Sequence, residues 1–164
     1  MDITRIVEEV GQFLYEYYLD ENKNKQGKLK KYDKNKLLCE ELSYKDDMLD
    51  GICYYYKNNE LFSKIEYKKN KIDGKYIIYY SNNQIKEENC YSNGQLNGET
   101  ISYYQNGRIH IVVNYLNNKL NGEKRKYFEN GNLEMLGNYK DNNMVGIWKW
   151  YNTEGELIKE KIIE

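Results

Sequence analysis

Short runs in which apolar and polar residues alternate follow one another along most of this chain. Between Gly98 and Gly122, residues 99–105 and 108–115 are two such runs, and Asn106-Gly107 separates them. Asn-Gly between two strand-forming runs is a strong hairpin signal, because both residues tolerate the positive φ of a type I′ turn. Each stretch of this kind is therefore predicted to form two antiparallel strands joined by a tight turn, with residues 116–122 as the return loop.

The runs recur with a nearly constant period, which six glycines mark. Their successive spacings are 24, 23, 24, 24 and 24 residues, for Gly27, Gly51, Gly74, Gly98, Gly122 and Gly146. A tyrosine follows five residues later at Tyr32, Tyr79, Tyr103, Tyr127 and Tyr151, with Tyr55 one step early in the 23-residue repeat. Such a period is typical of repeat proteins, in which each repeat buries its apolar face against its neighbours. The sequence thus predicts an all-β fold, one elongated antiparallel sheet with six β-hairpin repeats over residues 27–164 as one continuous domain.

Residues 1–26 allow two interpretations. Ile3, Ile6, Val10 and other apolar residues fit the spacing of an amphipathic helix. Gly11-Gln12-Phe13, however, aligns with Gly107-Arg108-Ile109 of a later repeat. Since the end of a repeat array must be atypical to terminate the stack, we favour a degenerate N-terminal capping hairpin over residues 1–26.

Composition and charge exclude several function classes. The 25 basic and 26 acidic residues are interspersed and give a net charge of −1, whereas a general nucleic-acid binder is strongly basic. The three cysteines, Cys39, Cys53 and Cys90, form no CxxC pair and are expected to be free thiols. No apolar run resembles a signal peptide or a transmembrane segment, so we expect a cytoplasmic protein with no membrane contact. Abundant Lys, Asn and Ile without any Ala or Pro suits an AT-rich bacterial genome.

The residues of catalytic and metal sites are scarce. His110 is the only histidine, which excludes a multi-histidine metal site, and no phosphate-binding glycine motif or HExxH occurs. Neighbouring carboxylates such as Glu40 and Glu41 are expected on opposite faces of a strand. We therefore predict no enzyme activity, no cofactor and no metal.

Alternation assigns side chains to two faces of the predicted sheet. Ile109, Ile111, Val113 and Tyr115 share the face that repeats, and His110, Val112 and Asn114 share the other. On the first strand of the repeats one face is predicted to carry aromatic residues, the candidate partner-binding set Tyr54, Tyr56, Tyr76, Tyr80, Tyr104, Phe128, Trp148 and Trp150. This stripe is either the second half of a core or an interface rich in hot-spot residues.

Trp148 and Trp150 depart most from the repeat, because the preceding repeat has Lys124 and Lys126 at their positions. We expect both tryptophans near an unpaired end of the sheet.

The pattern Gly-x4-Tyr-Tyr-x-Asn-Gly-x-Ile-x5-Tyr-x4-Leu-x-Gly, as in Gly98 to Gly122, resembles the bacterial variant of the MORN repeat. The resemblance extends over residues 27–164. Asp33 and Asn152 depart from the pattern at the second aromatic position and Lys36 at the turn glycine, which puts the terminal hairpins in question.

The resemblance implies a non-catalytic protein–protein interaction module. Proteins built wholly of such repeats are often described as antitoxins or immunity proteins that occlude a partner toxin. The alternative that the resemblance leaves open is a structural or envelope-associated, adhesion-type surface protein.

Overall fold

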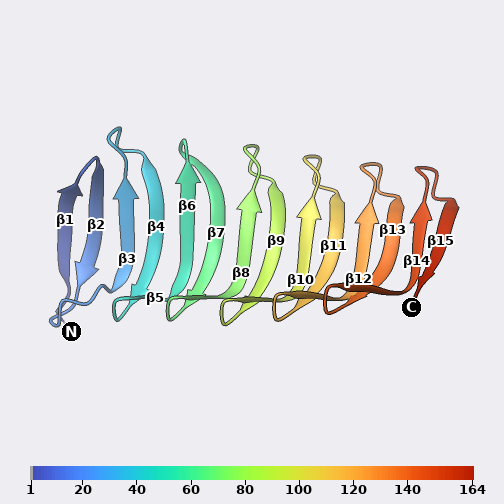
Figure 1. Cartoon of the computed structure of the whole chain (residues 1–164). Coiled ribbons are helices and arrows are strands. Elements are labelled where there is room, and N and C mark those ends of the chain that lie inside the picture. Colours follow the sequence, from blue (N-terminus) through green and yellow to red (C-terminus); the bar gives the residue numbers. More distant parts are fainter. Residues whose placement is uncertain (1) are drawn as a thin grey trace. The chain divides into compact units, whose positions relative to one another are not determined.

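The computed structural model describes residues 2–164, and within this range all regular structure is β-strand. The strands form a single open antiparallel sheet in chain order, while the short β5 pairs only with β4 (Figure 1). Their bounds are β1 Thr4–Val10, β2 Phe13–Leu19, β3 Gly27–Tyr32, β4 Leu38–Lys45, β5 Met48–Leu49, β6 Gly51–Lys57, β7 Glu60–Lys68, β8 Lys71–Tyr79, β9 Ile85–Ser92, β10 Gln95–Tyr103, β11 Ile109–Leu116, β12 Lys119–Tyr127, β13 Leu133–Lys140, β14 Asn143–Tyr151 and β15 Leu157–Ile163. The predicted all-β meander is confirmed.

The chain divides into two compact units. Unit 1 ends at Asn83 and contains β1–β8, and unit 2 begins at Gln84 and contains β9–β15. At the start of unit 1, β1 and β2 form an antiparallel hairpin in which Val10 pairs with Phe13, so the helical alternative for this segment does not occur. Gly11 takes φ 63° in the turn, where a residue without a Cβ is unstrained.

The loop at Asn106-Gly107 is longer than the predicted two-residue type I′ turn. The Tyr104 N–H donates to the Arg108 carbonyl at 2.8 Å, and the Gly107 N–H donates to the Tyr104 carbonyl at 2.9 Å. The loop therefore has three residues, and Gly107 is left-handed with φ 82°. Asn106 acts through its side chain instead, because its Oδ1 accepts the Arg108 N–H at 3.0 Å. This is the common three-residue hairpin connection.

Loops that lack the turn glycine or the aromatic residue adopt the same geometry. Lys36 takes φ 61° and donates its N–H to the Asp33 carbonyl. The Asp33 Oδ1 accepts the N–H groups of Asn35 and Leu37, so this short acid stabilises its own loop. Asn152 accepts the Glu156 N–H in the same way. The departures at Asp33, Lys36 and Asn152 therefore leave the terminal hairpins intact.

The 23-residue repeat has lost one loop residue. Asn58 and Asn59, with φ 51° and 65°, form a two-residue turn of type I′ between β6 and β7. Tyr56 pairs with Leu61 as Tyr103 pairs with Ile109. Tyr56, rather than Tyr55, thus holds the repeat's tyrosine position, and the predicted shift to Tyr55 is wrong.

Four of the six period-marking glycines, Gly74, Gly98, Gly122 and Gly146, lie inside strands rather than at the ends of return loops, whereas Gly27 and Gly51 begin β3 and β6. Asn117 and Asn118, with φ 50° and 66°, already turn the chain, and β12 runs through Gly122. Gly122 has φ 109° and sits where the register between β11 and β12 shifts, in a bulge. A Cβ on Gly122 would lie 3.3 Å from the Asn114 Cβ. Both the left-handed conformation and the close packing therefore require glycine here.

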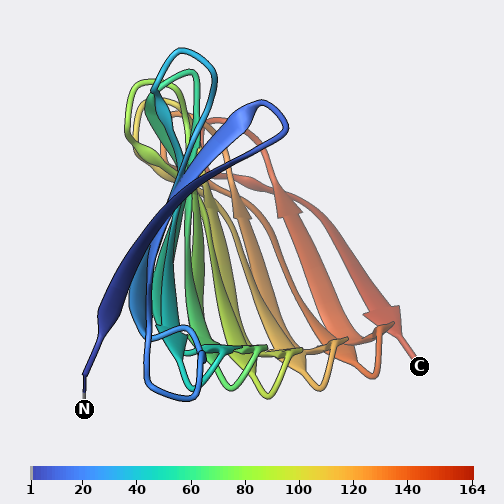
Figure 2. The same ribbon diagram turned by 90° about the vertical axis from the view of Figure 1, so that its left-hand side faces the viewer.

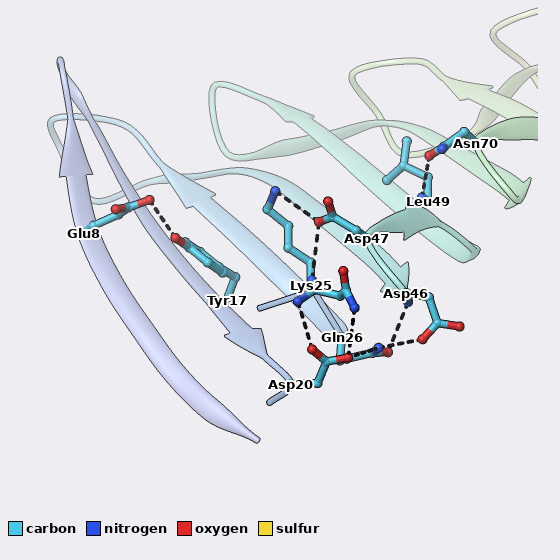
Figure 3. A network of polar contacts seen from close by, with 10 residues as sticks. Glu8, Tyr17, Asp20, Lys25, Gln26, Asp46, Asp47, Leu49 and Asn70 are labelled. Atoms are coloured by element: carbon cyan, nitrogen blue, oxygen red, sulfur yellow. Dashed lines mark hydrogen bonds and ion pairs between the residues drawn. The ribbon is translucent and has the colours of Figure 1, made fainter. Parts of the chain in front are cut away.

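A repeated clamp joins successive turns. In unit 2 the Asn118 N–H donates to the Leu96 carbonyl at 2.9 Å, and the Asn118 Oδ1 accepts the Leu96 N–H at 2.7 Å. Asn142 holds Leu120 in the same way, and in unit 1 Asn70 holds Leu49. Figure 3 shows the Leu49–Asn70 contact together with Asp47, which holds Lys25 in the same way. Within each unit these turns follow one another at the same end of the strands (Figure 2).

The two faces of the sheet bury different residues. We call the face of Leu29, Leu42 and Cys53 the core face of unit 1, and the face of Val113 and Trp148 the core face of unit 2. The opposite face of each unit, which carries Ile77 in unit 1 and Val112 in unit 2, is the reverse face. The predicted repeating face corresponds to the core face at Ile111, Val113 and Tyr115. The prediction is wrong for Ile109, which pairs with Tyr103 on the reverse face. Val112 on the reverse face is as buried as Val113.

Alternation fails at the first two residues of β11. Ile111 pairs with Ser102 and Ile109 with Tyr103, so His110 is the extra residue of a bulge. Its ring packs on Tyr104 with centroids 4.4 Å apart. His110 therefore does not follow Val112 and Asn114 in the simple alternating pattern.

Candidate functional site

The core face of unit 1 contains a hollow of about 400 Å³, which we call the tyrosine hollow. It is lined by Glu8, Val10, Tyr15, Tyr17, Lys25, Leu29, Lys31, Glu40, Leu42 and Tyr44. Period-two alternation in β2 puts Tyr15 and Tyr17 on one face, and the register sets Tyr15 opposite Lys31. Strands β1 to β4 and the segment before β3 thus supply the hollow, which gathers tyrosine rings around two buried leucines.

Charged groups in the hollow are already paired. Lys31 Nζ lies 2.8 Å from Glu40 Oε1, and this hydrogen bond raises the pKa of Lys31. Lys25 Nζ lies 3.6 Å from Asp47 Oδ1 and 5.5 Å from the centre of the Tyr44 ring. A lysine over an aromatic face is held by the ring quadrupole. These contacts hold the ammonium groups in place before any partner arrives.

Tyr17 is fixed by a second polar contact. Its hydroxyl donates to Glu8 Oε1 at 2.9 Å, a bond visible in Figure 3, which raises the pKa of Tyr17. Lys25 lies 6.0 Å from the centre of the same ring. The hollow therefore presents a preformed surface of aromatic rings and paired charges.

Beneath the hollow, unit 1 has an apolar core with no reactive group. Cys53 has no exposed surface, and burial raises the pKa of its thiol. Burial also raises the pKa of Tyr55 far above its ordinary value, with the nearby Tyr67 hydroxyl as the next cause. Cys53 thus stays a neutral thiol with the packing role of a small apolar side chain. Cys39, Cys53 and Cys90 are all free cysteines.

The predicted aromatic stripe does not lie on one face. Tyr54 pairs with Lys64, which in turn pairs with Ile77, so Tyr54 belongs to the reverse face. Tyr76 pairs with Ile65 and belongs to the core face. Tyr56 takes the position of Tyr103, whose hydroxyl donates to Glu88 at 2.9 Å. The error follows from the misplaced shift in the 23-residue repeat, because one residue moves a side chain to the other face.

Three further predicted residues begin loops. Tyr80, Tyr104 and Phe128 follow β8, β10 and β12, and each carbonyl accepts a loop N–H. The Tyr104 hydroxyl also donates to the Tyr127 carbonyl at 2.7 Å. These contacts give Tyr80, Tyr104 and Phe128 a structural part in the hairpin loops.

Trp148 is a core residue of unit 2. It is 1% exposed, and its ring lies over Gly137, where any Cβ would overlap with the indole. Tyr139 packs edge-on against it at 5.1 Å. Gly137 stands where the preceding repeat has Val113, so the large Trp148 compensates for the missing side chain. The small residue at position 137 and the large residue at position 148 both depart from the repeat and compensate in volume. This paired departure was the sequence signal for a core role of Trp148.

Trp150 is partly exposed, 6.2 Å from the Trp148 ring. Both tryptophans lie on β14, which pairs with β13 and β15 and is the second strand from the end of the described sheet, so they are near an unpaired end but not on the unpaired strand. Lysines flank the tryptophans, since Trp148 pairs with Lys161 and Trp150 with Lys159. Within residues 2–164, β15 is the strand at this end of the sheet.

The tyrosine hollow was missed from sequence. Tyr15 and Tyr17 lie in the segment with two interpretations, and their alternation with Leu14 and Glu16 was the usable signal. In the described range no cluster of three His, Cys, Asp or Glu residues is suited to a metal ion. Residues 2–164 also contain no helix with the length and apolarity needed to span a membrane.

Comparison with known proteins agrees with this architecture. The family model of the MORN repeat variant matches residues 72–93, 96–117, 120–141 and 144–162, about half of the chain. No curated protein matches the chain. Repeats of this family are generally protein- or membrane-interaction modules and are generally non-catalytic. The chain therefore belongs to the MORN repeat variant family.

Proposed function

We propose that this chain is a protein-binding module of the antitoxin or immunity type, which occludes part of a partner protein by seating it on the tyrosine hollow. The observation that carries the proposal is the gathering of Tyr15, Tyr17 and Tyr44 around buried leucines in a hollow of about 400 Å³. Tyrosine is enriched at interface hot spots, where an aromatic body contributes area and a hydroxyl contributes a hydrogen bond.

Preorganisation supports binding at this surface. Lys31 is held by Glu40 and Tyr17 by Glu8, so a partner does not have to immobilise these side chains on binding. Ordering a flexible side chain at an interface costs about 0.5–1.5 kcal/mol. A surface whose side chains are already ordered avoids much of this cost.

The chemistry of the hollow supports a non-catalytic role. Its described lining contains neither histidine nor cysteine. His110 lies in unit 2, where burial and then Lys126 lower the pKa of its imidazole. In the proposal, residues 1–26 are an N-terminal capping unit that also supplies part of the hollow. The protein acts in the cytoplasm, where its cysteines stay reduced.

The test is affinity capture of partners from native lysate with the full chain, followed by titration of the recovered partner. Tyr17→Ala should weaken binding by about 2 kcal/mol, because it removes a ring from the hollow. Tyr18→Ala is the matched control, since Tyr18 pairs with Arg5 on the reverse face while Tyr17 pairs with Ile6 on the core face. Equal affinities of the two variants, at equal melting temperatures, would reject the hollow as the binding site.

A further inference from the structure

Strand β15 has one free side. Among residues 2–164, β15 pairs with β14 and with no second strand. The outward N–H and C=O groups of such a strand can pair with an added strand.

The side chains of β15 form a symmetric pattern around Glu160. Ile158 and Ile162 are 65% and 68% exposed, and Lys159 and Lys161 alternate with them. Lys159 and Lys161 pair with the two tryptophans and thus lie on the core face, whereas Ile162 pairs with Ile147 on the reverse face. Ile158 lies in the bulge between Leu157 and Lys159 and pairs with no residue of β14. A strand added to β15 meets ammonium groups on one face and aliphatic groups on the other.

The two lysines lack carboxylate partners in the described part of the chain. Lys159 Nζ instead lies 5.0 Å from the centre of the Trp150 ring. Glu160, between them, is paired with Lys149 at 3.5 Å on the reverse face. On the core face, this edge therefore presents positive charge that no carboxylate within residues 2–164 neutralises. The acidic side chain of β15, Glu160, lies on the reverse face.

We infer that β15 accepts an extended acidic segment of a partner protein as an added strand. The complementary segment carries acidic residues opposite Lys159 and Lys161, a basic residue opposite Glu160 and an aliphatic residue opposite Ile162, with a further aliphatic residue beside the exposed Ile158. Opposite charges and apolar pairs across neighbouring strands each stabilise the pairing. The inference rests on the proposed function in that the occupant is a protein, but it concerns a second surface, in unit 2.

A second copy of β15 does not fit this edge. Antiparallel self-pairing centred on Glu160 would place Lys159 opposite Lys161 and Glu160 opposite its own copy. Like charges directly opposite destabilise a strand pair. Charged edge residues are a common means by which natural sheets prevent self-association.

The test uses a fluorescent peptide with the sequence Ile-Glu-Lys-Glu-Ile between glycines, titrated with the full chain. Saturable binding is expected, with affinity about tenfold higher than for the charge-exchanged peptide Ile-Lys-Glu-Lys-Ile. The double variant Lys159→Glu/Lys161→Glu should reverse this preference, which a merely unfolded variant cannot do. Lys140→Glu, on an exposed residue at the end of β13, is the control for a change of charge elsewhere and should keep the wild-type preference.

Backbone recognition and ligand class are tested with the same assay. N-methylation of alternate peptide bonds on the pairing side should abolish binding, since strand addition needs those N–H groups. Equal binding of the two peptides, binding of the methylated peptide, or equal competition by single-stranded DNA or phosphatidylserine vesicles would overturn the inference. Tyr17→Ala should leave peptide binding unchanged, so that failure at the tyrosine hollow and failure at β15 are distinguishable.

Discussion

Units 1 and 2 share one backbone pattern but fill their core faces in different ways. Unit 1 surrounds Leu29, Leu42 and Cys53 with partly buried tyrosines, which leave a hollow. Unit 2 buries Trp148 over Gly137. The turns, clamps and bulges are common to both units, so the repeat determines the backbone. The residues on neighbouring strands determine which side chains fill the core face, and hence which surface is available to a partner.

The largest expected effect is on stability and concerns the indole that fills the core face of unit 2. Trp148→Ala should lower the free energy of unfolding by about 3–5 kcal/mol, because it leaves a cavity over a glycine that offers no side chain. Urea unfolding measures this loss. Trp150→Ala is the matched control and should cost less, since Trp150 is partly exposed.

A double variant sharpens the same point. Gly137→Val alone should destabilise unit 2, since its Cβ overlaps with the indole. Gly137→Val combined with Trp148→Lys restores the Val113–Lys124 pair of the preceding repeat and should be more stable than Gly137→Val. Trp148→Lys completes the cycle, and additive losses across it would show that the two positions do not compensate.

A second effect appears at high pH in both units. Burial and then the hydrogen bond to Glu88 raise the pKa of Tyr103 in unit 2 from 10.0 to about 12. The folded state therefore holds this proton more tightly than the unfolded state. The contribution of the protonated Tyr103 to the free energy of unfolding is fully present below pH 10 and is lost as the pH rises through about 12. In unit 1 burial raises the pKa of Tyr55 further.

Urea unfolding at a series of alkaline pH values measures this loss. Tyr103→Phe should flatten the decline between pH 10 and 12, since it removes the titrating group. An unchanged slope in this variant would assign the decline to other groups.

The shared clamps should give equal effects in the two units. Asn118→Gly in unit 2 and Asn70→Gly in unit 1 keep a residue that tolerates positive φ but remove one side-chain hydrogen bond each. Each should cost about 1 kcal/mol. Thermal unfolding of the two variants compares them directly. A loss in only one unit would contradict a common scaffold.

The smallest expected effect is a gain in unit 1. Lys36 holds φ 61° where unit 2 has Gly107 at φ 82°. Lys36→Gly should stabilise the protein by about 0.5–1 kcal/mol, since glycine removes the left-handed strain at some cost in chain entropy. Lys34→Gly, in the same loop without positive φ, should give no gain. A gain from both variants would point to a cause other than backbone strain.

The sequence predicted the backbone better than the site. The period and the Asn-Gly signals were sufficient for the hairpin meander, because each hairpin is specified locally. The face of Tyr54 could not be assigned, since it depended on whether the deletion lay before or after Tyr56. The burial of Trp148 depended on Gly137 in the adjacent strand, a non-local pair that alternation within one strand does not reveal.

Site-specific photo-cross-linking tests most directly the claim that the tyrosine hollow binds a protein. p-Benzoylphenylalanine is placed at Tyr17 or, as the control, at Tyr18, and each chain is irradiated in native lysate. The account predicts a discrete cross-linked protein from position 17 and none from position 18, because Tyr17 lines the hollow and Tyr18 lies on the opposite face. The same cross-linked protein from both positions, or from position 18 alone, would contradict the account.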